Sequence, residues 1–198
     1  MIVTMIVTTS LREIAADIAA AELFSQQLNV PFVARNRQSM QELQNNTNAT
    51  VIIVFENQQP VVTNSAGKFF FHRGLSELRI LNMLRGGNDP LVKALGLEPG
   101  MRVLDCTLGL AADALVAAHA VGETGSVCGL ESVPLVALMT RFGLDSLQTN
   151  FADTSPELRA AAGRIEVVPA DHAAYLPELP YGAFDVVYFD PMFRRPKK

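Results

Sequence analysis

Four acidic residues in the second half of the chain each follow a short apolar stretch. They are Asp105, Glu131, Asp171 and Asp190. In open parallel sheets, ligands bind beyond the carboxyl ends of the strands, which is where such residues would gather. Carboxylates at that edge accept hydrogen bonds from hydroxyl and amine groups and attract cations. The spacing therefore predicts one site for a ligand that carries several of these groups.

The first of these stretches ends in Asp105 and is followed by a glycine at position 109. Gly109 lets the backbone approach a ligand closely because it has no Cβ. Asp105 is placed to accept hydrogen bonds from a cationic ligand group. An ordinary tight turn between a strand and a helix would also use such a glycine, so this segment alone leaves both interpretations open.

The acids after the second and third stretches are candidates for holding a nucleoside. Glu131 has the position of the acid that binds ribose hydroxyls in Rossmann-type sites, with a solvated loop glutamate as the alternative. Asp171 can accept a hydrogen bond from an adenine amine, although aspartate is also a favoured helix N-cap. A histidine placed like His172 is more often structural than catalytic.

The fourth stretch carries the most specific pattern, Asp190-Pro191-Met192-Phe193. Pro191 has no N–H and biases Asp190 away from helical geometry, so the chain leaves the strand in an extended kink. Such a kink can aim the Asp190 carboxylate and the Pro191 carbonyl at one amino group. Phe193 offers a flat face for stacking a base. A strand-terminating turn with a core phenylalanine is the alternative.

The elements that must position these residues are those of an α/β fold. Strands are predicted at 101–106, 126–130, 165–169 and 184–189, with helices at 111–120 and 134–142. Strands that are apolar throughout and joined by helices imply a doubly wound parallel sheet covered on both faces. A sheet that stops at its fourth strand would expose an apolar edge. We therefore expect dimerisation or poor solubility if these residues are the whole protein.

Residues 1–98 are predicted to form a small N-terminal α/β module, separate from a domain at 99–198. Its expected strands are 2–9, 31–33, 51–55, 61–63 and 68–71, and its expected helices are 11–28, 40–43 and 76–84. Ser39 is the expected cap of the second helix. The module carries no catalytic signature of its own, and substrate recognition is the role we expect for it.

The motifs together carry a family resemblance. Asp190-Pro191-Met192-Phe193 resembles the Asp/Asn-Pro-Pro-Tyr/Phe motif of amino-methyltransferases that act on adenine N6 or guanine N2. With 105–113 and 129–132, it resembles the bacterial guanine-N2 methyltransferases of small-subunit ribosomal RNA, over roughly residues 69–195. The resemblance implies the Rossmann-like class I methyltransferase fold, S-adenosyl-L-methionine as cofactor and ribosomal RNA as substrate. The sequence shows no clustered set of His, Cys and Asp ligands, so no metal is expected.

The resemblance also implies the site residues. The cofactor would be bound by Asp105, Thr107, Gly109, Ala112, Asp113, Glu131, Ser132, Asp171, His172 and Asp190, and catalysis would use Asp190, Pro191 and Phe193. Two positions depart from the family pattern. Ala112 stands where the ribosomal RNA enzymes tend to carry arginine, and Met192 replaces the second proline of the general motif. The base that is modified therefore stays open.

Composition limits the remaining possibilities. The net charge is −4 and charged residues are 18% of the chain, so there is no overall basic field for nucleic acid. Local patches remain: six cations against three acids between residues 30 and 85, and a basic end at 194–198. Two cysteines in apolar stretches suit a reducing compartment, and the N-terminus has no long apolar run, so the cytoplasm is expected.

Three other functions compete with this interpretation. A nicotinamide-dependent oxidoreductase should show a fuller Gly-x-Gly-x-x-Gly turn than the sequence from Thr107 to Ala112 provides. A small-molecule methyltransferase is compatible with the motif, which recognises an amine and not RNA itself. A catalytically silent module that binds the cofactor or RNA is the third.

Overall fold

The computed structural model describes residues 4–64, 67–149 and 152–191. It divides into two compact units, an N-terminal unit (Met1–Phe71) and a C-terminal unit (His72–Lys198). The sequence had placed this division between residues 98 and 99. It lies earlier because the helices α3 (Gly74–Leu84) and α4 (Pro90–Leu95) pack against α5 (Ala112–Val121) of the C-terminal unit.

The N-terminal unit is a mixed four-stranded sheet between two helices. The strands are β1 (Met5–Thr9), β2 (Val51–Glu56), β3 (Gln59–Asn64) and β4 (Gly67–Phe70), in that spatial order, and only the β1–β2 pair is parallel. The helix α1 (Ala15–Leu28) covers one face, where Phe24 meets Phe55 edge to face at 5.3 Å. The helix α2 (Met40–Thr47) covers the other, where Leu43 packs with Ile6, Ile52 and Val54.

Local capping explains one boundary in this unit, and two other elements differ from the prediction. Ser39 caps α2 with a full capping box that includes Glu42, as its position predicted. The first helix begins at Ala15, later than expected, and the strand expected at 31–33 is reduced to a single parallel bridge between Phe32 and Val7.

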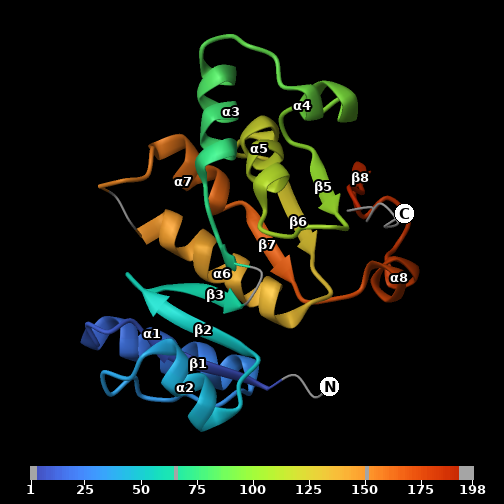
Figure 1. The fold of residues 1–198 in the computed structure, drawn as a ribbon. Helices are drawn as coiled ribbons and strands as arrows, with labels where there is room; N and C mark the ends of the chain where they lie inside the picture. Colours follow the sequence, from blue (N-terminus) through green and yellow to red (C-terminus); the bar gives the residue numbers. More distant parts are fainter. Residues whose placement is uncertain (1–3, 65–66, 150–151, 192–198) are drawn as a thin grey trace, which may run out of the picture. The chain divides into compact units, whose positions relative to one another are not determined.

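The C-terminal unit is built on four parallel strands. They are β5 (Arg102–Asp105), β6 (Ser126–Leu130), β7 (Ile165–Val168) and β8 (Val186–Tyr188), and their spatial order is β7-β6-β5-β8 (Figure 1). All four predicted strands are therefore present, with ends shifted by one or two residues. Because the strands are parallel, their carboxyl ends share one edge of the sheet.

Both faces of this sheet are covered, which confirms the doubly wound α/β prediction. On one face α5 packs against the strands and against α7 (Pro156–Ala162), and α6 (Pro134–Thr149) contacts β7 and α7. On the other face, a buried cluster contacts the segment that includes α8 (His172–Tyr175) and the 3₁₀ helix η1 (Leu176–Glu178). The cluster is Leu104, Cys106, Cys128 and Leu130.

Three short helices were not predicted, although two of them carry a recognisable start. Asp89 caps α4 and Ser155 caps α7, and in each case a proline follows at the first helical position. That pairing is a common helix-start signal because the missing N–H of proline costs nothing there. Among the described helices, none is long and apolar enough to cross a bilayer.

Candidate active site at the strand ends

The acidic residues at the ends of β5, β6 and β8 lie at one edge of the sheet. Asp105 ends β5, and Asp190 follows β8, the neighbour of β5 on one side. The backbone N–H of Asp190 donates to Thr107 Oγ1 at 2.8 Å. Glu131 follows β6, the other neighbour, and its Oε2 accepts from the N–H of Gly109 at 3.1 Å. The convergence predicted from the sequence is therefore observed.

Glu131 is held in place by the loop that it supports. Its second oxygen accepts from the N–H of Val133 at 2.8 Å, while Thr140 donates to the carbonyl of Gly109 at 2.6 Å. Gly109 has φ +52°, which favours glycine. A carboxylate can accept about four hydrogen bonds and the loop uses two, so Glu131 retains capacity for ligand hydroxyls. Thr140 was not predicted, since nothing distinguishes a threonine inside an apolar helix.

Gly129 on β6 allows this loop to approach the sheet. A Cβ at this position would lie 2.4 Å from Leu108 Cδ1, so a side chain there would displace Leu108. The N–H of Leu108 donates to the carbonyl of Leu130 at 3.0 Å, which fixes the loop against the end of β6. Gly129 therefore allows the loop to pack against β6, while Gly109 allows the loop to turn.

Asp105 lies beneath the loop and is only 3% exposed. Its Oδ1 accepts from the N–H of Thr107 at 2.9 Å. Burial raises the pKa of Asp105 from 3.8 to about 6, and the negative charges of Asp113 and Asp190 add to this. A group of carboxylates that destabilise one another is suited to a cationic ligand, which would relieve their repulsion.

Asp105→Asn should raise the stability of the protein at pH 8. The folded pKa of Asp105 lies above its unfolded value, so its stabilising effect is complete below pH 3.8 and is lost as the pH rises through about 6. The full shift corresponds to about 3 kcal/mol. Asparagine keeps an acceptor for the N–H of Thr107. We expect the thermal midpoint to rise by several degrees at pH 8, with no rise near pH 4. A variant less stable than the wild type at pH 8 would contradict this.

Asp171, which follows β7, has the alternative role considered from the sequence, that of a helix N-cap. Its Oδ1 accepts from the N–H of Ala173 at 2.8 Å, so Asp171 is the N-cap of α8. The ring of His172 meets Phe189 edge to face at 5.3 Å. As an N-cap, Asp171 keeps acceptor capacity on its second carboxylate oxygen. Ser132 is exposed in the loop after β6, and Phe193 lies outside the described residues.

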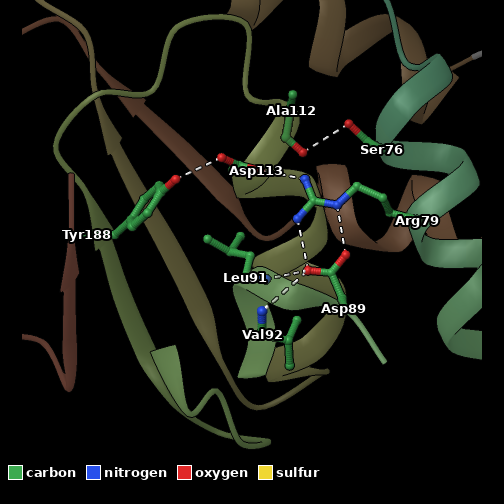
Figure 2. A network of polar contacts seen from close by, with 8 residues as sticks. All are labelled: Ser76, Arg79, Asp89, Leu91, Val92, Ala112, Asp113 and Tyr188. Atoms are coloured by element: carbon green, nitrogen blue, oxygen red, sulfur yellow. Dashed lines mark hydrogen bonds and ion pairs between the residues drawn. The ribbon is translucent and has the colours of Figure 1, made fainter. Parts of the chain in front are cut away.

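Figure 2 shows a polar network of the C-terminal unit that the sequence did not predict. Arg79 on α3 binds both oxygens of Asp89, at 2.8 and 2.9 Å, and forms an ion pair with Asp113 on α5. Asp89 also accepts from the backbone N–H of Leu91 at 3.0 Å. Tyr188, the last residue of β8, donates its hydroxyl to Asp113 at 2.9 Å. The network thus connects three helices to the strand that leads into Asp190.

This network involves three residues singled out from the sequence. Asp113 was expected to bind the cofactor; its two oxygens accept from Arg79 and Tyr188, and, as for Glu131, acceptor capacity remains for a ligand. Arg79 was counted among the cations available for RNA, and it is engaged inside the C-terminal unit instead. The carbonyl of Ala112, also an expected cofactor contact, accepts from Ser76 Oγ at 3.0 Å, which fixes the start of α5.

Arg79→Met should lower the thermal midpoint by about 10 °C, because it leaves the buried Asp89 without its cation and costs about 3 kcal/mol. The Asp89 side chain is 3% exposed. Differential scanning calorimetry measures the shift. Arg85→Met is the matched control, since Arg85 is exposed at the end of the same helix. Equal effects of the two substitutions would show that the network contributes little.

Comparison with known proteins identifies the family of this chain. Residues 32–198 match the family described as putative SAM-dependent methyltransferase, which is most of the chain. The chain belongs to this family. Its cofactor is accordingly S-adenosyl-L-methionine. The protein YpiP of Bacillus subtilis, which carries the description uncharacterized, is 40% identical over 190 residues, covering 96% of this chain and 72% of that protein.

Other relatives carry a more specific name, ribosomal RNA small subunit methyltransferase J. The one from Coxiella burnetii is 29% identical over 92% of this chain and 67% of its own length. The one from Laribacter hongkongensis is 37% identical, over 54% of this chain and 36% of its own length. A crystal structure of a SAM-dependent methyltransferase from Neisseria gonorrhoeae has a TM-score of 0.67 and 22% identity, covering 96% of this chain and 70% of its own. This last likeness supports the fold.

Proposed function

We propose that this methyltransferase transfers a methyl group to the exocyclic amine of a nucleobase in RNA, and specifically to guanine N2 of ribosomal RNA. The observation that carries the proposal is the place of Asp190-Pro191, which follows β8 next to β5, the strand that ends in Asp105. The names of the relatives support an RNA substrate. The fourth-strand motif supports an amine as the acceptor.

The strand ends fit the groups of S-adenosylmethionine. Glu131 is positioned to accept from two ribose hydroxyls, and Asp171 from the adenine amine. The negative charges of Asp105, Asp113 and Asp190 are close enough to influence one another and complement a cationic ligand. When bound, the cofactor supplies an electrophilic methyl group. The chain's task is then to hold the two reactants in line and exclude water, which accounts for several orders of magnitude in rate.

Asp190 and Pro191 act on the amine. An exocyclic amine is a poor nucleophile because its lone pair is delocalised into the ring. Hydrogen bonds from the amine to the Asp190 carboxylate and the Pro191 carbonyl favour a pyramidal nitrogen and stabilise the positive charge that develops there. The same carboxylate can accept the proton that the nitrogen loses. In this proposal Phe193 stacks on the base.

The N-terminal unit and the basic end of the chain are the proposed contacts for RNA phosphates. Of the cations between residues 30 and 85, Arg37 and Lys68 in the N-terminal unit and Arg85 in the C-terminal unit are exposed, whereas Arg73 pairs with Glu77 and bonds Thr154. Phosphate contacts position a nucleic acid without reading its sequence. The choice of base would then rest with the strand-end site.

Methyl transfer from labelled cofactor to ribosomal RNA that lacks modifications tests the function. Nucleoside analysis should find the label in N2-methylguanosine. Label in another nucleoside would overturn the assignment of the base. Label in a small molecule but not in RNA would favour the small-molecule alternative. Cofactor binding without transfer to any acceptor would favour the silent module.

A further inference from the structure

The N-terminal unit contains a pocket of its own. Its volume is about 450 Å³, and every residue that lines it belongs to the N-terminal unit. Three cationic side chains line the pocket, Arg12, Arg35 and Lys68, together with two carboxylates, Asp17 and Glu56. A volume of this size accommodates a small organic ligand.

The pocket lies where an open sheet binds ligands. The residue after β1, Ser10, and the residue after β2, Asn57, both line it, and these two strands are parallel. Arg35 follows the parallel bridge of Phe32 to β1. Three chain segments that run in the same direction therefore deliver residues to one edge. This is the carboxyl edge, which is the usual ligand position in such sheets.

Arg35 has the character of a ligand-binding residue. It is only 5% exposed, and among the described residues its Nε has no hydrogen-bond partner and its guanidinium has no ion pair. Its Nη1 meets only the sulfur of Met40, a weak acceptor. The negative charge of Glu13 favours the charged form of Arg35, but the Glu13 carboxylate accepts a hydrogen bond from the N–H of Asn36. Burying a cation in this way costs stability unless an anion joins it.

A second buried group at the pocket also lacks a partner. Asp17 is 2% exposed, and its Oδ1 accepts from the N–H of Gln58 at 2.6 Å. For its Oδ2, no partner exists within the part of the chain that the structure describes. A simple anion would satisfy Arg35 and leave Asp17 unsatisfied. A ligand that combines an anionic group with a hydroxyl or amine donor would satisfy both Arg35 and Asp17.

We propose that this pocket binds a ribonucleotide, with its phosphate on the guanidinium of Arg35 and a sugar or base donor on the carboxylate of Asp17. Arg12 and Lys68 raise the positive charge around the phosphate. Arginine is suited to this role because its planar guanidinium binds phosphate oxygens in pairs. The ligand is either a free nucleotide or a nucleotide of an RNA strand. The proposal does not depend on the methyl transfer proposed above.

Calorimetric titration of the full chain tests this, with uridine 5′-monophosphate and a ten-nucleotide oligouridylate as probes. Uracil has no exocyclic amine, so neither probe offers the acceptor proposed for Asp190, and the two proposals can fail separately. We expect the 5′-monophosphate to bind and uridine itself not to bind. Tighter binding of the oligouridylate identifies an RNA strand as the source, and equal binding identifies a free nucleotide.

Arg35→Met should weaken binding of the phosphate probes about tenfold or more, because charged hydrogen bonds to phosphate are lost. Lys93→Met is the control for the loss of a positive charge, since Lys93 is exposed on α4 and does not line the pocket. Arg35→Met should also keep or raise the thermal midpoint, because it removes a buried charge without a partner. The proposal is overturned if neither probe binds, if both substitutions act alike, or if Arg35→Met lowers the midpoint by several degrees, which indicates a structural role.

Discussion

Asp190→Ala is expected to reduce methyl transfer by a factor of about 10² or more, while the dissociation constant for S-adenosylmethionine changes only a few-fold. The reason is the position of Asp190 at the end of β8. Its backbone is fixed by the bond from its N–H to Thr107 Oγ1, and alanine keeps that bond. The substitution therefore removes the proposed acceptor for the amine and leaves the hydrogen bond to the loop at Thr107 intact.

The matched control for this prediction is Asp185→Ala. Asp185 lies directly before the same strand, at its opposite end, where it pairs with Arg102 on the surface. Its loss should leave the transfer rate unchanged within a few-fold, because an exposed ion pair contributes little to stability. If Asp190→Ala retains wild-type turnover, or Asp185→Ala loses as much, the role assigned to Asp190 is wrong.

Glu131→Ala is expected to weaken binding of S-adenosylmethionine by a factor of about 10². Two effects add. The carboxylate proposed to accept from the ribose hydroxyls is lost, and the N–H groups of Gly109 and Val133 lose the acceptor that orders the loop. Isothermal titration calorimetry measures the change.

Glu123→Ala controls for the loss of a glutamate. Glu123 is exposed in the turn before β6, at the opposite end of the strand that Glu131 follows. Binding by this variant should equal that of the wild type. Glu131→Gln keeps one carbonyl acceptor and should fall between the wild type and Glu131→Ala. Wild-type affinity in Glu131→Ala would remove Glu131 from the cofactor site.

The strand ends could be predicted from the sequence because their signals are local. Continuous apolar runs identify buried parallel strands, and the residue after each run must lie at the ligand-binding edge. This argument placed Asp105, Glu131 and Asp190 together without any knowledge of side-chain contacts. The proline after Asp190 marked the end of β8 in the same way.

The unit boundary and the polar network were not predictable by this route. The apolar face of α3 indicates a helix that packs, but not which sheet it packs near, so the division was placed at 98 and not at 71. The ion pair of Arg79 with Asp113 joins residues from separate helices. Asp171 had two local interpretations, and only the coordinates distinguish the N-cap. Tertiary contacts decide the unit boundary and the ion pair, and a single sequence does not encode them in a local pattern.

The roles assigned to the strand ends are tested most directly by two quantities measured on the same two variants. These are the dissociation constant for S-adenosylmethionine and the single-turnover rate of methyl transfer to RNA at saturating cofactor. We predict that Glu131→Ala raises the dissociation constant and leaves the saturated rate within a few-fold, whereas Asp190→Ala lowers the rate and leaves the dissociation constant within a few-fold. A result in which both variants change both quantities by similar factors would contradict the division between a cofactor-binding strand end and an amine-binding one.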